Sequence, residues 1–181
     1  MIEWAIWWNE TVDRWKTEGL PDLNRYEMYD YFGLDMYRET GCSAQTAATP
    51  RAPSHGAPVA ATEEEYEKIL PTLYQPYSFN DEEQSWIEEN RRGENIFRFA
   101  MQGVFWYPRQ LMGIEDHLYA FYDRPDLMHR MNEDLCNWLC TTVDYVQEQI
   151  TPDFVTFAED MSYNHGSMVS REIYEEFILP Y

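Results

Sequence analysis

Hydrophobic positions recur with a helical period along several stretches of this chain. Aromatic and aliphatic residues fall on one face of residues 3–16, which predicts an amphipathic helix that Gly19 and Pro21 end. Four residues whose side chains suit a helix N-cap precede further stretches with this period: Asn24, Thr62, Asn80 and Ser170. A long apolar stripe beginning at Asp123-Arg124-Pro125, with Asp123 as the expected cap, predicts a helix of roughly six turns, which Pro152 ends.

Two short apolar runs, residues 95–101 and 153–158, predict β-strands on either side of the long helix. A weaker third strand is expected near Leu34. Strand, long helix, strand and a following helix form a βαβα unit, which implies an α/β fold with a parallel sheet. Residues 40–62 are instead rich in Ala, Thr, Ser, Pro and Gly, which indicates a flexible connection.

The composition is that of a protein with a sizeable core, since 44% of the 181 residues are hydrophobic and 17% are aromatic. The 33 acidic residues outnumber the 13 basic ones and give a formal net charge of −20. Phosphate backbones and anionic membranes repel such a chain, so neither nucleic-acid binding nor membrane attachment is expected. No apolar run is long enough for a membrane span, and the first residues do not resemble a signal peptide, so a cytoplasmic protein is predicted.

The three cysteines lack the spacing of a disulfide framework, and free thiols in a reducing compartment are the simpler interpretation. Cys136 and Cys140 are four residues apart and could share a metal ion. Leucine and valine residues flank them, however, so thiols that line the core are the favoured interpretation. No metal site is therefore predicted within this chain.

Polar side chains follow both predicted strands. Residues 103–109 come after the first strand and end in Arg109, and residues 159–166 come after the second and include acidic, hydroxyl and imidazole groups. In parallel α/β folds the loops beyond the carboxyl ends of the strands hold the active site. The alternative is that Glu159 or Asp160 caps a local turn and that His165 belongs to turn chemistry, and the spacing alone does not decide between the two.

Several blocks of sequence resemble the uroporphyrinogen decarboxylase superfamily. Residues 99–106 are similar to a strand and Gly-Ala-Pro-Trp loop of that family, and residues 111–127 to its next pair of helices. Residues 157–161 and 170–181 resemble its strand ending in Glu and the Ser-Pro-x-x-Phe-x-x-Phe-x-x-Pro-Tyr helix that follows. Residues 31–35 resemble a stretch of its methyltransferase-like and uncharacterised branches, which places the chain closest to those branches.

The resemblance implies the amino-terminal part of a TIM-type (β/α) barrel that does not close within this chain. A helical region would cover residues 1–94, with the flexible segment inside it, and residues 95–181 would hold the first βα units. A complete barrel typically has about 250 residues and eight strands. We therefore expect a truncated chain that is not a stable, active monomer by itself and that could form a homodimer.

The resemblance also implies a tetrapyrrole or a corrinoid-linked substrate. In the decarboxylases, acetate side chains of the tetrapyrrole leave as carbon dioxide without a cofactor. In the related methyltransferases, a zinc-bound thiolate accepts a methyl group from a corrinoid, and the zinc ligands would lie outside this chain. Both reactions stay open at this point, and so does the alternative of an inactive remnant that serves as a binding or oligomerisation module.

The expected site residues combine the resemblance with position in the two loops. The candidate catalytic residues are Asp35, Glu159, Asp160 and His165. The candidate substrate-binding residues are Arg109, as a clamp for carboxylates, and Trp106, Tyr107 and Tyr163, as pocket walls. Arg109 and Asp160 should lie on the same rim within ~15 Å of each other, because neighbouring strands are only ~4.8 Å apart.

Overall fold

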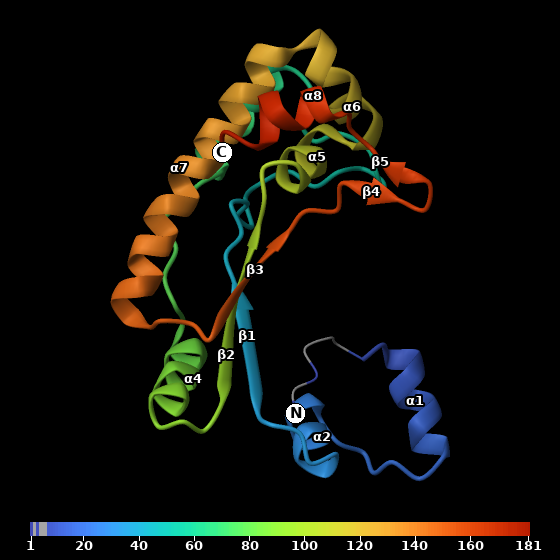
Figure 1. Ribbon diagram of the computed structural model, residues 1–181, viewed down its shortest axis with the longest axis vertical. Coiled ribbons are helices and arrows are strands. Elements are labelled where there is room, and N and C mark those ends of the chain that lie inside the picture. The colour runs from blue at the N-terminus through green and yellow to red at the C-terminus, as the bar shows by residue number, and fades with distance from the viewer. Residues whose placement is uncertain (2, 4–6) are drawn as a thin grey trace. The chain divides into compact units, whose positions relative to one another are not determined.

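The computed structural model describes residues 1, 3 and 7–181, and within them the chain is a mixed α/β protein. Three strands form a parallel sheet in the order β1-β2-β3 (Figure 1): β1 Tyr37–Gly41, β2 Ile96–Gln102 and β3 Phe154–Ala158. The described residues also form eight α-helices: α1 Asn9–Thr17, α2 Arg25–Tyr31, α3 Glu63–Ile69, α4 Asp81–Arg91, α5 Trp106–Met112, α6 Ile114–Asp123, α7 Pro125–Gln149 and α8 Arg171–Ile173. A short antiparallel hairpin, β4 Ser162–Tyr163 and β5 Gly166–Ser167, follows β3. The described residues form no closed barrel.

The chain forms two compact units, each assembled from separate stretches of sequence. Unit 1 consists of residues 1–40, 79–99 and 152–154. Unit 2 consists of residues 41–78, 100–151 and 155–181. Each of the three strands contributes residues to both units.

Unit 1 is held together by Asp153, which comes from its last stretch. One carboxylate oxygen of Asp153 accepts hydrogen bonds from the backbone N–H of Phe97 at 2.7 Å and from the side chain of Asn90 at 2.8 Å. The Asp153 backbone N–H also donates to the carbonyl of Phe97 at 3.0 Å. Unit 1 also buries five large aromatic side chains: Tyr29, Tyr37, Phe79, Phe97 and Phe99.

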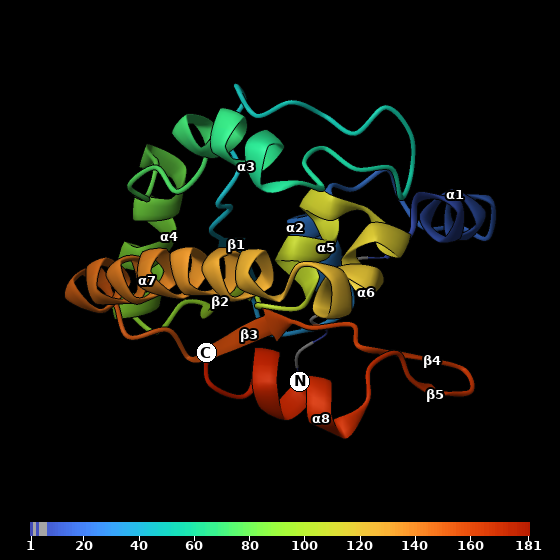
Figure 2. The same ribbon diagram turned by 90° about the horizontal axis from the view of Figure 1, so that it is seen from above.

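Unit 2 is built around α7. Figures 1 and 2 show α5, α6 and α8 gathered near the amino-terminal half of this long helix. Leu127, Met131 and Leu135 of the predicted apolar stripe are buried on α7, and fully buried side chains from α5 pack with them. After α8 the chain continues in one π-helical turn, Tyr174–Ile178, whose Phe177 is buried.

Four of the five helix caps predicted from the sequence are confirmed. Asn24, Thr62 and Asn80 each form a complete capping box with a glutamate three residues later, and the Ser170 hydroxyl accepts the N–H of Ile173. The expected cap at Asp123 is wrong, because Asp123 is the last residue of α6 and Arg124 precedes α7 without a side-chain cap.

Three other expectations need correction. The first helix begins at Asn9 rather than residue 3, and Trp4, on which that prediction partly rested, lies outside the described residues. The first strand begins at Tyr37 rather than near Leu34. Trp106, Tyr107 and Arg109, expected in a loop, lie in the helix α5.

Residues 40–62 make many fixed contacts. Thr40 and Gly41 are the last residues of β1, and the N–H of Cys42 donates to the carbonyl of Ala100 at 3.2 Å. The hydroxyls of Thr46 and Thr49 both donate to the carbonyl of Thr72, at 2.9 and 3.0 Å. Residues 41–62 of this stretch therefore pack as part of unit 2.

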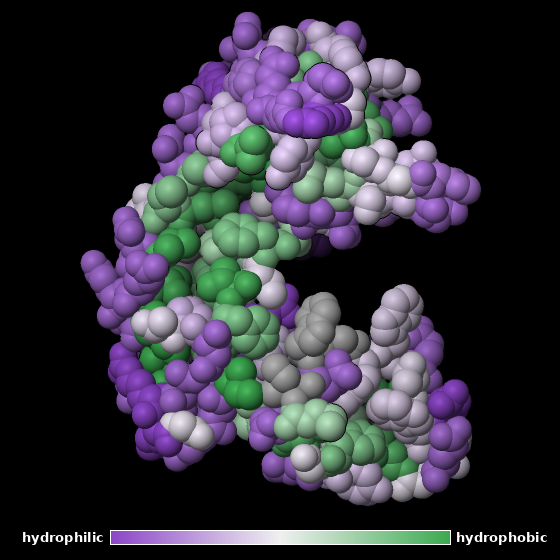
Figure 3. Space-filling view, in the orientation of Figure 1, coloured by the Kyte–Doolittle hydropathy of each residue, from purple (hydrophilic) through white to green (hydrophobic). Residues whose placement is uncertain are grey.

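The strand β3 carries exposed apolar side chains. Val155 is 43% exposed and Phe157 is 60% exposed, although β3 is an edge strand of the sheet formed by the described residues. Figure 3 shows hydrophobic side chains gathered over β3 and α7 on this face. Phe157 and Leu139 of α7 both line a cavity of 190 Å³. None of the described helices is both long and apolar enough to cross a membrane.

Candidate functional site

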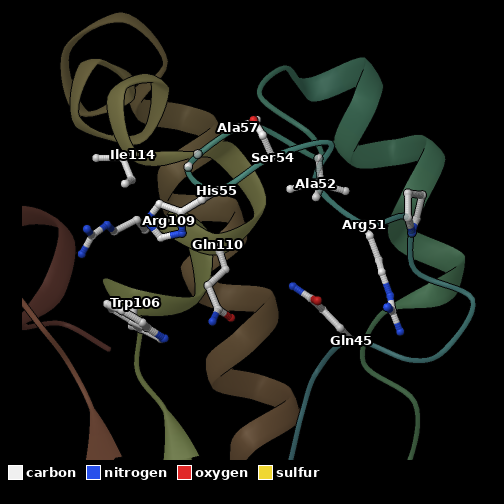
Figure 4. Close-up of a pocket in the computed structure, with 14 residues that line it drawn as sticks. Gln45, Arg51, Ala52, Ser54, His55, Ala57, Trp106, Arg109, Gln110 and Ile114 are labelled. Atoms are coloured by element: carbon white, nitrogen blue, oxygen red, sulfur yellow. The ribbon is translucent and has the colours of Figure 1, made fainter.

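A cavity of 370 Å³ in unit 2 lies between residues 45–59 and the helices α5 and α6 (Figure 4). We call it the arginine cavity. Its polar lining consists of Gln45, Arg51, Ser54, His55, Arg109 and Gln110, and Trp106 adds an aromatic wall. In Figure 4, Arg51 and Arg109 lie on opposite sides of the cavity, with the guanidinium of Arg109 directed away from Arg51, and Gln45 and Gln110 extend into the space between the two residues.

Two glycines allow the two walls to meet at the backbone. Gly56 and Gly113 have φ angles of +76° and +80°, which side chains rarely permit. The N–H of Ile114 donates to the carbonyl of Gly56 at 3.1 Å, and a Cβ atom on Gly113 would lie only 2.6 Å from that oxygen. The carbonyl of Leu111 accepts a further two backbone N–H groups, from Val59 and Ala60, at 2.7 and 2.9 Å. The loop that carries Arg51 and His55 is thus attached firmly to the α5–α6 turn.

The arginine cavity is lined by basic side chains but by no acidic ones. Of the 13 Lys and Arg residues, all but Arg51 and Arg109 form an ion pair with a carboxylate in the part of the chain that the structure describes. Both exceptions line the arginine cavity, and no Asp or Glu is among the lining residues. In a chain with 33 acidic residues, the lining of this cavity thus carries two positive charges that no described carboxylate pairs with. The cavity is therefore suited to an anion.

Arg109 has an oriented guanidinium group. One of its nitrogens donates to the backbone carbonyl of Asp160 at 3.5 Å, and its Cζ atom lies 5.1 Å from the centre of the Trp106 ring. The expected proximity of Arg109 and Asp160 is therefore confirmed. The Asp160 side chain itself is exposed, and its role as an acid or base stays a prediction.

Glu159 lies outside the lining of the arginine cavity and binds the beginning of α5. Its carboxylate accepts the backbone N–H groups of Phe105 at 3.1 Å and Trp106 at 2.9 Å, which have no partner inside the helix. Gly103 makes room for it, since a Cβ atom there would lie 1.9 Å from a carboxylate oxygen of Glu159. Burial raises the pKa of Glu159 above its usual value, and the backbone hydrogen bonds oppose this shift.

The other predicted site residues do not line the arginine cavity. Tyr107 is fully buried, and its ring packs 6.0 Å from that of Tyr74. Tyr163 and His165 are exposed in the β4–β5 hairpin, where their rings lie 5.8 Å apart. Asp35 belongs to unit 1, where its carboxylate pairs with the amino group of Met1.

Sequence reasoning missed the half of the site that residues 45–59 supply. One signal was available, because residues 40–62 contain no acidic residue at all in a chain that has 33. Arg51 and His55 therefore have no carboxylate nearby in the sequence. That bias distinguishes the segment from an ordinary solvated loop of this very acidic protein.

Comparison with protein-family models, with curated proteins and with solved structures found no match. The described residues contain no group of three or more His, Cys, Asp or Glu side chains placed to hold a metal ion. The arginine cavity is thus the arrangement in unit 2 from which a function can be argued most directly.

Proposed function

We propose that this protein binds a small molecule with several carboxylates in the arginine cavity. The observation that carries the proposal is that the two arginines without a carboxylate partner among the described residues line the same cavity. Arginine is the side chain best suited to carboxylates, because its planar guanidinium can donate two parallel hydrogen bonds. The amides of Gln45 and Gln110 add neutral donors, and Trp106 offers a flat apolar wall.

The resemblance to the uroporphyrinogen decarboxylase superfamily suggests the class of this ligand. A tetrapyrrole with acidic side chains combines flat rings with carboxylates, and these are the two features that the lining of the arginine cavity complements. Ligand cavities usually measure about 300–1,000 Å³, so a cavity of 370 Å³ would hold part of a macrocycle with its carboxylate arms. The rest of such a ligand would extend beyond the cavity.

Decarboxylation is the reaction that this lining supports better. Arg51 and Arg109 would hold the substrate through its carboxylates, and Asp160, whose backbone carbonyl accepts a hydrogen bond from Arg109, would be the acid–base residue. Methyl transfer from a corrinoid remains the alternative reaction, with zinc ligands supplied from outside this chain. Methyl transfer would depend less on the two arginines than decarboxylation would.

Absorbance titration with uroporphyrin, a stable tetrapyrrole rich in carboxylates, tests the proposal. Arg51→Gln and Arg109→Gln should each weaken binding about 10-fold or more, because a charge-assisted hydrogen bond contributes about 1.5–3 kcal/mol. Arg171→Gln is the matched control, since Arg171 is highly exposed and pairs with Glu175, and it should bind like the original protein. Cobalamin, which lacks free carboxylates, should bind more weakly. Equal binding by all three variants would refute the proposal.

A second candidate function is self-association through β3, which the exposed Val155 and Phe157 favour. An edge strand presents unpaired backbone groups that a second copy of the chain can pair with. Light scattering coupled to size-exclusion chromatography should then show a dimer that Phe157→Ser converts largely to monomer. If the original protein is monomeric in this experiment, self-association through β3 is excluded.

A further inference from the structure

Unit 2 contains a second cavity, of 580 Å³, and four of its ten lining residues are aromatic. We call it the aromatic cavity. Residues 70–77 form one wall and the middle of α7 forms the other. Four rings line it: Tyr74, Tyr77, Trp138 and Tyr145. Neither lysine nor arginine is among the lining residues, and Asp134 is the one acidic residue in the lining.

The four rings are arranged as walls rather than as a stack. Tyr74 and Trp138 lie 6.4 Å apart at 55° to each other, and Tyr77 and Tyr145 lie 6.1 Å apart at 76°. The indole N–H of Trp138 donates to the carbonyl of Gln75 at 2.8 Å, which fixes the orientation of the ring. Rings set at steep angles around a space present their faces and edges to whatever occupies it.

Tyr74 adopts an unfavourable backbone conformation in this wall. Its φ angle of +57° makes it the one residue other than glycine with a positive φ in the described part of the chain. Such a conformation costs about 1–3 kcal/mol and persists only where surrounding contacts impose it. Here the N–H of Tyr74 donates to the carbonyl of Ala44 at 2.8 Å, and its hydroxyl lies 2.9 Å from that of Tyr66. These contacts thus stabilise a strained backbone conformation that places the Tyr74 ring in the wall of the aromatic cavity.

The charge beside the rings is negative. The Tyr66 hydroxyl donates to Asp134 at 2.9 Å, and the nearest cation, the Nε atom of Arg130, is 3.9 Å from the same carboxylate oxygen. Arg130 also pairs with Glu63 and Glu67, so one positive charge is shared among three carboxylates. Burial raises the pKa of Tyr74 far above its usual range, so that ring stays uncharged at neutral pH. The aromatic cavity therefore combines neutral rings with an incompletely compensated carboxylate.

We propose that the aromatic cavity binds an organic ammonium ion, with the alkylated nitrogen against the rings and its charge toward Asp134. Aromatic faces attract cations through the negative potential of their π-electrons, and rings at steep angles can surround an ammonium group with attached methyl groups. An anionic ligand would meet Asp134 without a lining cation to offset it. The arginine cavity and the aromatic cavity would thus select ligands of opposite charge, and the second proposal does not depend on the first.

The test compares two ligands that differ in charge but hardly in shape. Choline and 3,3-dimethylbutan-1-ol have the same branched end, with a charged nitrogen in the first and a neutral carbon in the second. Each is titrated into the complete chain while amide and indole N–H signals are followed by NMR, and Trp138→Phe identifies the Trp138 indole signal by its loss. Choline should shift that signal in a saturable way and bind about 10-fold more tightly than the alcohol.

Three variants add independent evidence. Asp134→Asn should weaken choline binding about threefold to tenfold without changing the affinity for the alcohol, because only the charge contact is lost. Tyr145→Leu should weaken binding of choline more than of the alcohol. Arg51→Gln, in the other cavity, should leave choline binding unchanged. Equal affinity for the two ligands, no saturation by about 100 mM choline, or shifts confined to signals away from Trp138 would overturn the proposal.

Discussion

Mild acid should destabilise this protein through His117. This side chain is completely buried in unit 2, with the rings of Phe105 and Phe121 at 4.8 and 4.9 Å. Neither of its ring nitrogens has a hydrogen-bond partner among the described residues. Burial, and secondarily the positive charge of Arg109, lowers the pKa of His117 from 6.5 to about 3. The folded protein therefore keeps this imidazole neutral in conditions where the unfolded chain protonates it.

The size of the effect follows from the two pKa values. Because the pKa of His117 is lower in the folded state, its contribution to stability is present above pH 6.5 and is lost as the pH falls toward 3. Between about pH 7.5 and about pH 5.5, preferential protonation of the unfolded chain should cost about 1.4 kcal/mol. That loss is a sizeable part of the ~5–15 kcal/mol that stabilises a typical domain.

Urea unfolding followed by circular dichroism at these two pH values measures the loss. His117→Leu keeps a side chain of similar volume but cannot titrate, so its loss of stability should be smaller by about 1.4 kcal/mol. His165→Leu is the matched control, because it makes the same substitution at an exposed position. The comparison between variants cancels the titration of the many carboxylates. If His117→Leu loses as much stability as the original protein, the assignment of a neutral buried imidazole is incorrect.

Three further substitutions test single contacts, and thermal or urea unfolding measures each. Gly103→Ala places a Cβ atom where the Glu159 carboxylate lies and should cost about 1–3 kcal/mol by displacing it from α5; an unchanged stability would mean that this carboxylate does not hold the helix. Asn80→Ala removes the capping box of α4 and should cost about 1 kcal/mol, and a loss well below half of that would contradict the cap. Tyr66→Phe removes the hydrogen bond to Asp134 and should cost about 1–3 kcal/mol, whereas a neutral result would show that this bond contributes nothing.

The sequence predicts the parts of the fold that depend on local chemistry. The caps at Asn24, Thr62 and Asn80 could be identified because each box is complete within four residues. The order in residues 40–62 could not, because its hydrogen bonds go to residues such as Leu111 that are distant in sequence. Composition alone does not reveal such partners.

The candidate site, too, was predictable only in part. Position after a strand singled out Trp106 and Arg109, and both line the arginine cavity. It misplaced Tyr107, because α5 begins at Trp106 and adjacent residues on a helix point about 100° apart. Trp106 faces the cavity and Tyr107 faces the core. A loop, which was the expectation, would have imposed no such separation.

The position of Asp153 has a consequence for the order in which the chain can fold during synthesis. The hydrogen bonds from Asn90 and Phe97 end on a residue that leaves the ribosome more than fifty positions later. Until then unit 1 lacks this tie, while its large rings are already available for contacts with other chains. Structures that depend on contacts between residues far apart in the sequence fold more slowly and expose apolar surface for longer. Chaperone dependence during translation should therefore be concentrated in the interval between the emergence of Phe97 and that of Asp153.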